Sequence, residues 1–140
     1  MIGSILAKRT VGSAFAMLNQ GDVDGFFAKW ADESVWNFPP DVSVGGSIKG
    51  KKSIVEWFRR WMQQFPKRKF VLRNICVRDI FSFTATNVVA VEWDLSVTNK
   101  DGKDVELQGV TVVEIKNFKA IRATDYFFNI AALKRAWGEA

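Results

Sequence analysis

The chain has 140 residues, of which 48% are hydrophobic and 25% charged, and its formal net charge is +5. This length and composition predict a single soluble, globular domain over residues 1–140, and no stretch approaches the ~20 apolar residues of a membrane span. Histidine is absent, which excludes Ser-His-Asp and Cys-His catalysis and His-ligated zinc, so acid–base chemistry would have to come from carboxylates, lysines or the single tyrosine.

The first half of the chain carries helical patterns. Apolar residues recur at helical spacing on both sides of Gly21, which is well placed to end one helix, while Asp22 can cap the next. The expected elements are a helix over 10–19, a helix over 22–30 that ends by 31–34, a short strand over 35–38 stopped by two prolines, a loop over 45–50 and a helix over 53–65.

The second half has the composition of strands. Asp101-Gly102 marks a hairpin turn, because this pair tolerates positive φ. The expected elements are strands over 69–79, 88–98, 105–116 and 120–128, a turn over 82–87 and a short helix over 130–137. Three helices followed by a meander of strands predict an α+β fold, in which an antiparallel sheet curves around a helical layer.

The strand over 88–98 alternates strictly between apolar and polar residues. Glu92 and Asp94 lie on the polar face, about 6.5–7 Å apart along the strand. If that face lines a pocket, the two carboxylates form a candidate acid–base pair; if it faces water, they serve solubility. The pattern of this strand alone favours the solvent-facing interpretation.

Charge and cysteine usage indicate the partners and the compartment. The lysine and arginine clusters are scattered over helix ends and turns, so we expect no nucleic-acid partner and no membrane partner. Residues 1–30 show no secretory signal, and the single cysteine, Cys76, cannot form an internal disulfide. A cytoplasmic location is therefore expected, with Cys76 as an inert thiol buried in an apolar strand.

Four motifs together resemble the SnoaL-like branch of the NTF2-like (ketosteroid-isomerase-like) superfamily. They are Asn-x-Gly-Asp-x-Asp-Gly over 19–25, the short strand before Pro39, the helix start Gly-Lys-Lys-Ser-Ile over 50–54 and the closing strand over 121–127. The resemblance implies a cone-shaped α+β barrel, with three N-terminal helices packed on a curved, mostly antiparallel sheet and a pocket between them. It also implies a homodimer formed through the outer face of the sheet.

The pocket motif is most similar to that of limonene-epoxide hydrolases. Their Tyr-x-Asn-x-Pro, Arg-x-Asp and Asp-Tyr-Phe motifs align here so that Asn37, Asp94 and Asp125 are kept. Val35 and Glu92 stand where that family has Tyr and Arg. The resemblance implies that the two aspartates act as acid and base, that Asn37 orients a water or substrate oxygen, and that Glu92 modulates them.

Other chemistries of the superfamily fit less well. Ketosteroid isomerases place an Asp before the proline and a Tyr in the first helix, where this chain has Phe38 and Ala14. Scytalone-dehydratase-like chemistry depends on histidine, which is absent. The aromatic residues expected to bind a substrate are Trp36, Phe38, Trp57 and Tyr126.

We therefore predict an epoxide-hydrolase-like hydrolase or isomerase that uses no cofactor or metal and acts on a small apolar molecule. The alternatives are a non-catalytic module that binds a small ligand and a polyketide-cyclase-like enzyme. The resemblance favours a pocket-facing Glu92 and Asp94, because the outer sheet face of this superfamily is often buried in a dimer. The expected dimer face is the apolar side of the same strand, made by Val89, Val91, Trp93 and Val97.

Overall fold

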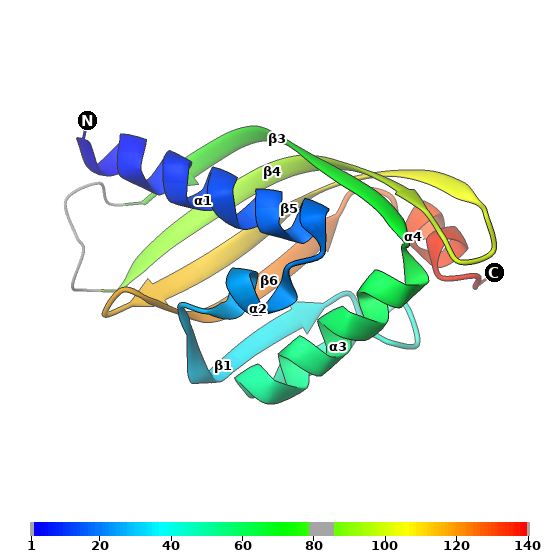
Figure 1. The fold of residues 1–140 in the computed structure, drawn as a ribbon, viewed down its shortest axis with the longest axis horizontal. Helices are drawn as coiled ribbons and strands as arrows, with labels where there is room; N and C mark the ends of the chain where they lie inside the picture. The colour runs from blue at the N-terminus through cyan, green and yellow to red at the C-terminus, as the bar shows by residue number, and fades with distance from the viewer. Residues whose placement is uncertain (1, 79–85, 140) are drawn as a thin grey trace.

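The computed structural model describes residues 2–78 and 86–139, with side chains from residue 8 onward, and shows helices packed on one face of a curved six-stranded sheet (Figure 1). The elements are α1 (Ile2–Gln20), α2 (Val23–Phe27), β1 (Trp30–Phe38), β2 (Gly46–Lys49), α3 (Lys51–Gln64), β3 (Lys67–Val77), β4 (Asn87–Thr98), β5 (Asp104–Lys116), β6 (Lys119–Phe127) and α4 (Ile130–Ala136). The strand order is β2-β1-β6-β5-β4-β3, and only the β1–β6 pair is parallel. The predicted α+β fold is confirmed.

The helices bury one apolar face each against the sheet. In α3, Ile54, Trp57 and Trp61 recur every three or four residues and are at most 5% exposed, whereas Lys52 and Arg60 on the opposite face are exposed. α1 and α2 cover the rest of the inner face, and α4 packs against β5 near the β4–β5 turn (Figure 1). None of the helices in the described part of the chain is long and apolar enough to cross a membrane.

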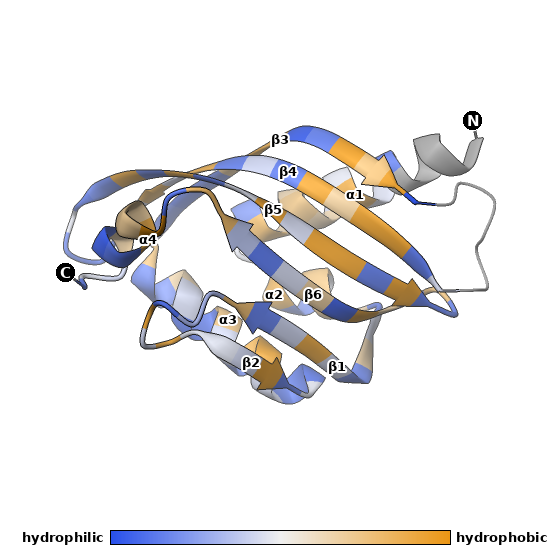
Figure 2. Cartoon of the chain, turned by 180° about the vertical axis from the view of Figure 1, so that it is seen from behind, coloured by the Kyte–Doolittle hydropathy of each residue, from blue (hydrophilic) through white to orange (hydrophobic). Residues whose placement is uncertain are grey.

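The strands alternate between an inner and an outer face. Along β4 the apolar residues Val91, Trp93 and Leu95 are buried, each at most 2% exposed, and the residues between them point outward. Figure 2 shows the sheet from behind, with α1, α2 and α3 on its far side. The core therefore lies entirely between the helices and the inner face of the sheet.

The predicted element boundaries differ from the structure where pairing between distant strands determines the secondary structure. The helix expected over 22–30 ends at Phe27, because Trp30 pairs with Ala120 of β6 and already belongs to β1. The loop expected over 45–50 contains β2, which pairs with the end of β1. Cys76 is exposed, so its predicted burial is wrong: in β3 it lies opposite Ala90, on the outer face. The turn expected over 82–87 falls largely outside the described residues.

Arg68 joins the ends of two helices. Its Nε donates to the carbonyl oxygen of Leu18 at 3.0 Å, and its Nη1 donates to that of Phe65 at 3.1 Å. These carbonyls lie at the C-terminal ends of α1 and α3. That of Leu18 also accepts from the N–H of Gly21 at 3.1 Å, so Arg68 adds a charged donor there. Burial lowers the pKa of Arg68. The side chain thus ties α1 and α3 to the start of β3.

We expect Arg68→Ala to lower the free energy of unfolding by about 2–3 kcal/mol, because it leaves carbonyl groups without a charged donor. The matched control is Arg59→Ala on α3, whose exposed side chain pairs with exposed Asp24 of α2 at 2.7 Å. Such exposed pairs are worth less than about 1 kcal/mol. Urea denaturation measures both changes, and equal losses in the two variants would contradict the role assigned to Arg68.

Candidate functional site

A small cavity of about 30 Å³ lies between the helices and the inner face of the sheet. That volume holds about one water molecule. Nine of the thirteen residues that line it are aromatic, two are leucines, and Thr111 and Asp125 are the polar ones. The cavity therefore offers a carboxyl group to a ligand in otherwise apolar surroundings.

Two donors hold the carboxyl group of Asp125. Trp36 Nε1 donates to Oδ2 at 2.9 Å, and Thr111 Oγ1 donates to Oδ1 at 2.6 Å. Trp93 Nε1 in turn donates to Thr111 Oγ1 at 2.9 Å. Because Thr111 accepts from the indole, its own hydrogen is directed at the carboxyl group. The four side chains form a directed chain of hydrogen bonds that fixes the carboxyl group in the cavity wall.

Burial raises the pKa of Asp125 from its ordinary value of 3.8 to about 6. The hydrogen bonds from Thr111 and Trp36 favour the ionised form and act in the opposite direction, but they do not cancel the cost of removing the charge from water. A carboxyl group with this pKa exchanges its proton near neutral pH. It is therefore suited to act as a general acid or base.

The strand register brings these residues together. In β6, alternation directs Ala123, Asp125 and Phe127 inward, and Asp125 lies directly opposite Thr111 of β5. Gly109 makes room for the indole of Trp93: a Cβ at this position would lie 2.8 Å from Trp93 Cη2 and 2.3 Å from the carbonyl oxygen of Tyr126. The glycine thus permits the ring position from which Trp93 reaches Thr111.

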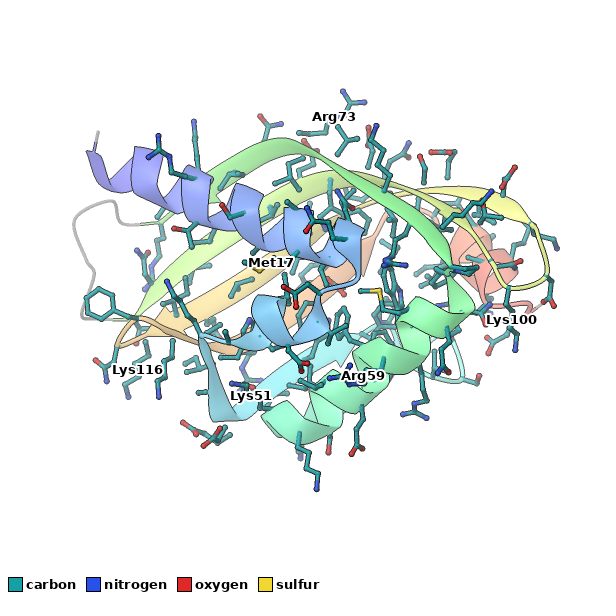
Figure 3. All side chains as sticks on the ribbon, viewed as in Figure 1. Met17, Lys51, Arg59, Arg73, Lys100 and Lys116 are labelled. Carbon is teal, nitrogen blue, oxygen red and sulfur yellow. The ribbon has the colours of Figure 1, made fainter. Side chains whose placement is uncertain are left out.

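The prediction that Glu92 and Asp94 face the pocket is wrong. Both lie on the outer face, because Trp93 between them points inward. Asp94 accepts a hydrogen bond from Arg73 Nε at 2.6 Å and is ion-paired with that guanidinium, while Glu92 accepts from Asn74 Nδ2 at 2.7 Å. Arg73 projects away from the helices, beyond β3 (Figure 3). The structure therefore does not bring Asp94 together with Asp125.

The apolar side of β4 is likewise not an exposed dimer face. Val89, Val91, Trp93 and Val97 are each at most 4% exposed within one chain. They form the floor of the core beneath the helices. The reason is energetic: burying a large apolar side chain stabilises the fold by about 1.5–3 kcal/mol each, so the apolar side of β4 faces the helices.

Asn37 also points to the outer face. Its Nδ2 donates to Thr124 Oγ1 at 3.1 Å, and its Oδ1 accepts from Ser47 Oγ at 2.6 Å. The side chain therefore links β1 to its two neighbouring strands, and it does not line the cavity. Tyr126 is 56% exposed and is absent from the cavity wall as well.

Three of the aromatic residues expected to bind a substrate do line the cavity: Trp36, Phe38 and Trp57. Thr111 and Trp93 were not expected at the site. Thr111 carries a signal in the sequence, since it is the one polar residue on the inner side of a strand whose other inner residues include Val105 and Leu107. In the described ranges, no group of three or more Cys, Asp or Glu side chains is arranged to hold a metal ion.

Comparisons with known proteins identify the family of the chain and relatives with the same fold. The SnoaL-like domain family matches residues 11–123, whereas no curated protein matches. Bal32a, from a soil-derived mobile gene cassette, is 21% identical with a TM-score of 0.82, over 96% of this chain and 98% of that one. A candidate isomerase from Bacillus subtilis is 21% identical with a TM-score of 0.81, over 100% and 98%.

An NTF2-like protein of unknown function from Burkholderia pseudomallei is similar over 93% of this chain and 95% of its own, with 20% identity and a TM-score of 0.79. At such identities the solved structures show the fold. The family match covers residues 11–123, which is most of the 140 residues. The chain therefore belongs to the SnoaL-like family and has the NTF2-like fold.

Proposed function

We propose that this protein is a proton-transfer enzyme, in which Asp125 serves as the acid and base for a small apolar molecule with an acidic C–H bond. The observation that carries the proposal is the position of Asp125: a carboxyl group with a pKa of about 6, held by two donors in a wall of aromatic side chains. The description of the Bacillus subtilis neighbour as a candidate isomerase supports the same class of reaction.

Isomerisation suits this site better than epoxide hydrolysis. Hydrolysis by two carboxyl groups needs one to protonate the epoxide oxygen while the other activates water, yet Asp94 lies on the outer face with Arg73. Isomerisation needs one group. The Asp125 carboxylate takes a proton from the carbon beside a carbonyl, leaving an enolate, and the resulting carboxylic acid returns the proton to another carbon of the conjugated system. The step needs no cofactor or metal.

Proton exchange at carbon tests the proposal without knowledge of the natural substrate. 2-Tetralone is an uncharged, aromatic-fused ketone with exchangeable hydrogens beside its carbonyl group. We expect the protein to accelerate replacement of these hydrogens by deuterium in D₂O, followed by proton NMR. A cyclase that begins by removing the same kind of proton would also give this signal. Exchange no faster than in buffer, across a panel of such ketones, would refute proton transfer.

A non-catalytic binding module is the second candidate. Both carboxylate oxygens of Asp125 already accept hydrogen bonds from the protein, an arrangement that also suits a structural role. Saturable binding of an aromatic molecule without any exchange would favour this candidate. A homodimer through the outer sheet face and a cytoplasmic location stay predictions.

A further inference from the structure

An open groove of about 280 Å³ lies at the carboxyl ends of β1 and β6. The parallel ladder between these strands ends with Asn37 beside Thr124, and Pro39 and Pro40 follow directly. Because proline has no N–H to donate, the pairing stops there and the two chain segments separate. The groove therefore results from the separation of β1 and β6 at the end of their ladder.

The groove and the inner cavity share three lining residues: Phe38, Asp125 and Phe127. The rings of Phe38 and Phe127 contact each other edge to face, with centroids 5.3 Å apart and planes at 68°. The wall between the two spaces thus consists largely of two side chains that can rotate about their χ angles. Asp125 lines both spaces, and movement of these rings would both open the groove toward its carboxyl group and enlarge the small cavity behind them.

The groove differs from the cavity in its polar groups. Asn37, Thr124 and Tyr126 contribute amide and hydroxyl groups to its lining, beside the apolar surface of Phe38 and Ile130. The inner cavity offers aromatic carbon and the single carboxyl group. The inner cavity holds about one water molecule, so an aromatic ring enters it only if side chains in its wall move. The groove beside it can accept hydroxyl or carbonyl substituents of the same molecule.

The charged residues that line the groove and the cavity further restrict which ligands can bind. Asp41 and Asp125 are the charged side chains among the described residues that line either space, and neither space is lined by a lysine or arginine. The chain as a whole carries +5, so its general field attracts anions while the lining repels them. An anionic ligand would place its charge near the exposed Asp41 carboxylate and near Asp125 in its aromatic wall, and the approach to Asp125 is costly because that wall excludes water.

We propose that the groove is the outer compartment of the ligand site, and that an uncharged aromatic molecule passes from it between Phe38 and Phe127 to reach Asp125. Its polar substituents remain in the groove beside Asn37, Thr124 and Tyr126. The inference rests on the proposed function for the role of Asp125, and it adds the class of ligand and the route by which that ligand arrives.

Blocking the groove tests the route. In Cys76→Ser/Asp41→Cys, a bulky maleimide attached at exposed position 41, which lines the groove, should slow association of 2-naphthol by about tenfold or more relative to the unlabelled variant. The control is the native chain carrying the same label on exposed Cys76 of the edge strand β3. Stopped-flow quenching of tryptophan emission reports the rates. Equal association rates in both labelled proteins would overturn the route.

The charge preference is tested with probes of matched shape. We expect 2-naphthol to bind the native protein at least about tenfold more tightly than 2-naphthoate, a difference of about 1.4 kcal/mol. Equal or tighter binding of the carboxylate, or no binding of 2-naphthol, would overturn the ligand class. Both tests measure binding alone. If the protein exchanges protons but the label at position 41 does not slow association of 2-naphthol, the route is refuted and the proposed function stands.

Discussion

Asp125→Asn should lower the rate of proton exchange at carbon by about 10²–10⁴-fold, the usual contribution of a positioned acid or base. Asparagine keeps the shape of the side chain and can still accept from Trp36 Nε1, but it cannot take up a proton. In the native protein, the rate should rise with pH through about 6 and then level off, because the ionised form of Asp125 is the base. The variant should lose this rise.

Asp94→Asn is the matched control for this loss. It makes the same chemical change on the outer face of β4, where the carboxylate is paired with Arg73. We expect the exchange rate of this variant to stay within about twofold of the native rate, since surface changes of this kind alter stability only slightly. An equal loss of activity in both variants, or activity retained in Asp125→Asn, would remove Asp125 from its proposed role.

Folding stability should depend on pH through the same carboxyl group. The pKa of Asp125 is 3.8 in its ordinary state and about 6 in the fold. Between these values the folded protein retains a proton that the unfolded chain has released, so the free energy of unfolding falls as pH rises from about 4 to 6. The full difference corresponds to about 3 kcal/mol.

Asp125→Asn removes this titration, so the variant should gain about 3 kcal/mol relative to the native protein between pH 4 and pH 7. Urea denaturation at several pH values measures the change, and the other titrating groups cancel because both proteins contain them. Thr111→Val provides a second comparison. This substitution removes a hydrogen-bond donor to the ionised form of Asp125, so the pKa of Asp125 should rise further. The fall in the free energy of unfolding should then extend above pH 6. Parallel curves for native and Asp125→Asn would show that Asp125 does not titrate as described.

The layers of this fold were predictable because the patterns that define them are local. α3 repeats its large apolar residues at helical spacing, and β4 alternates over its whole length. The boundaries of β1 were not predictable in the same way. Residues 31–34 lie in β1 between Trp30 and Val35, which both pair with β6, and β6 comes almost ninety positions later in the chain. Pairing across such separations leaves little trace in a local window.

The site shows the same division. The alternation along β4 correctly placed Asp94 and Trp93 on opposite faces of the sheet. Alternation alone does not tell which of the two faces the helices cover. The apolar residues on the Trp93 face indicated that the helices cover this face. The resemblance to epoxide hydrolases favoured the opposite face, with Asp94 in the pocket. Asp125 was recognised as a candidate from its motif. Its hydrogen bonds to Trp36 and Thr111 depend on the register of three strands, which no single segment encodes.

The parallel pairing of β1 with β6 affects the order in which the parts of the protein fold. Trp36 and Asp125 are 89 positions apart, so in a chain growing from the ribosome the edge of β1 that faces β6 stays unpaired until β6 has been synthesised. Contacts of such high sequence separation form slowly. The pocket is thus completed late in folding, and a nascent chain lacking β6 would present unpaired backbone and tryptophan rings to its neighbours or to chaperones.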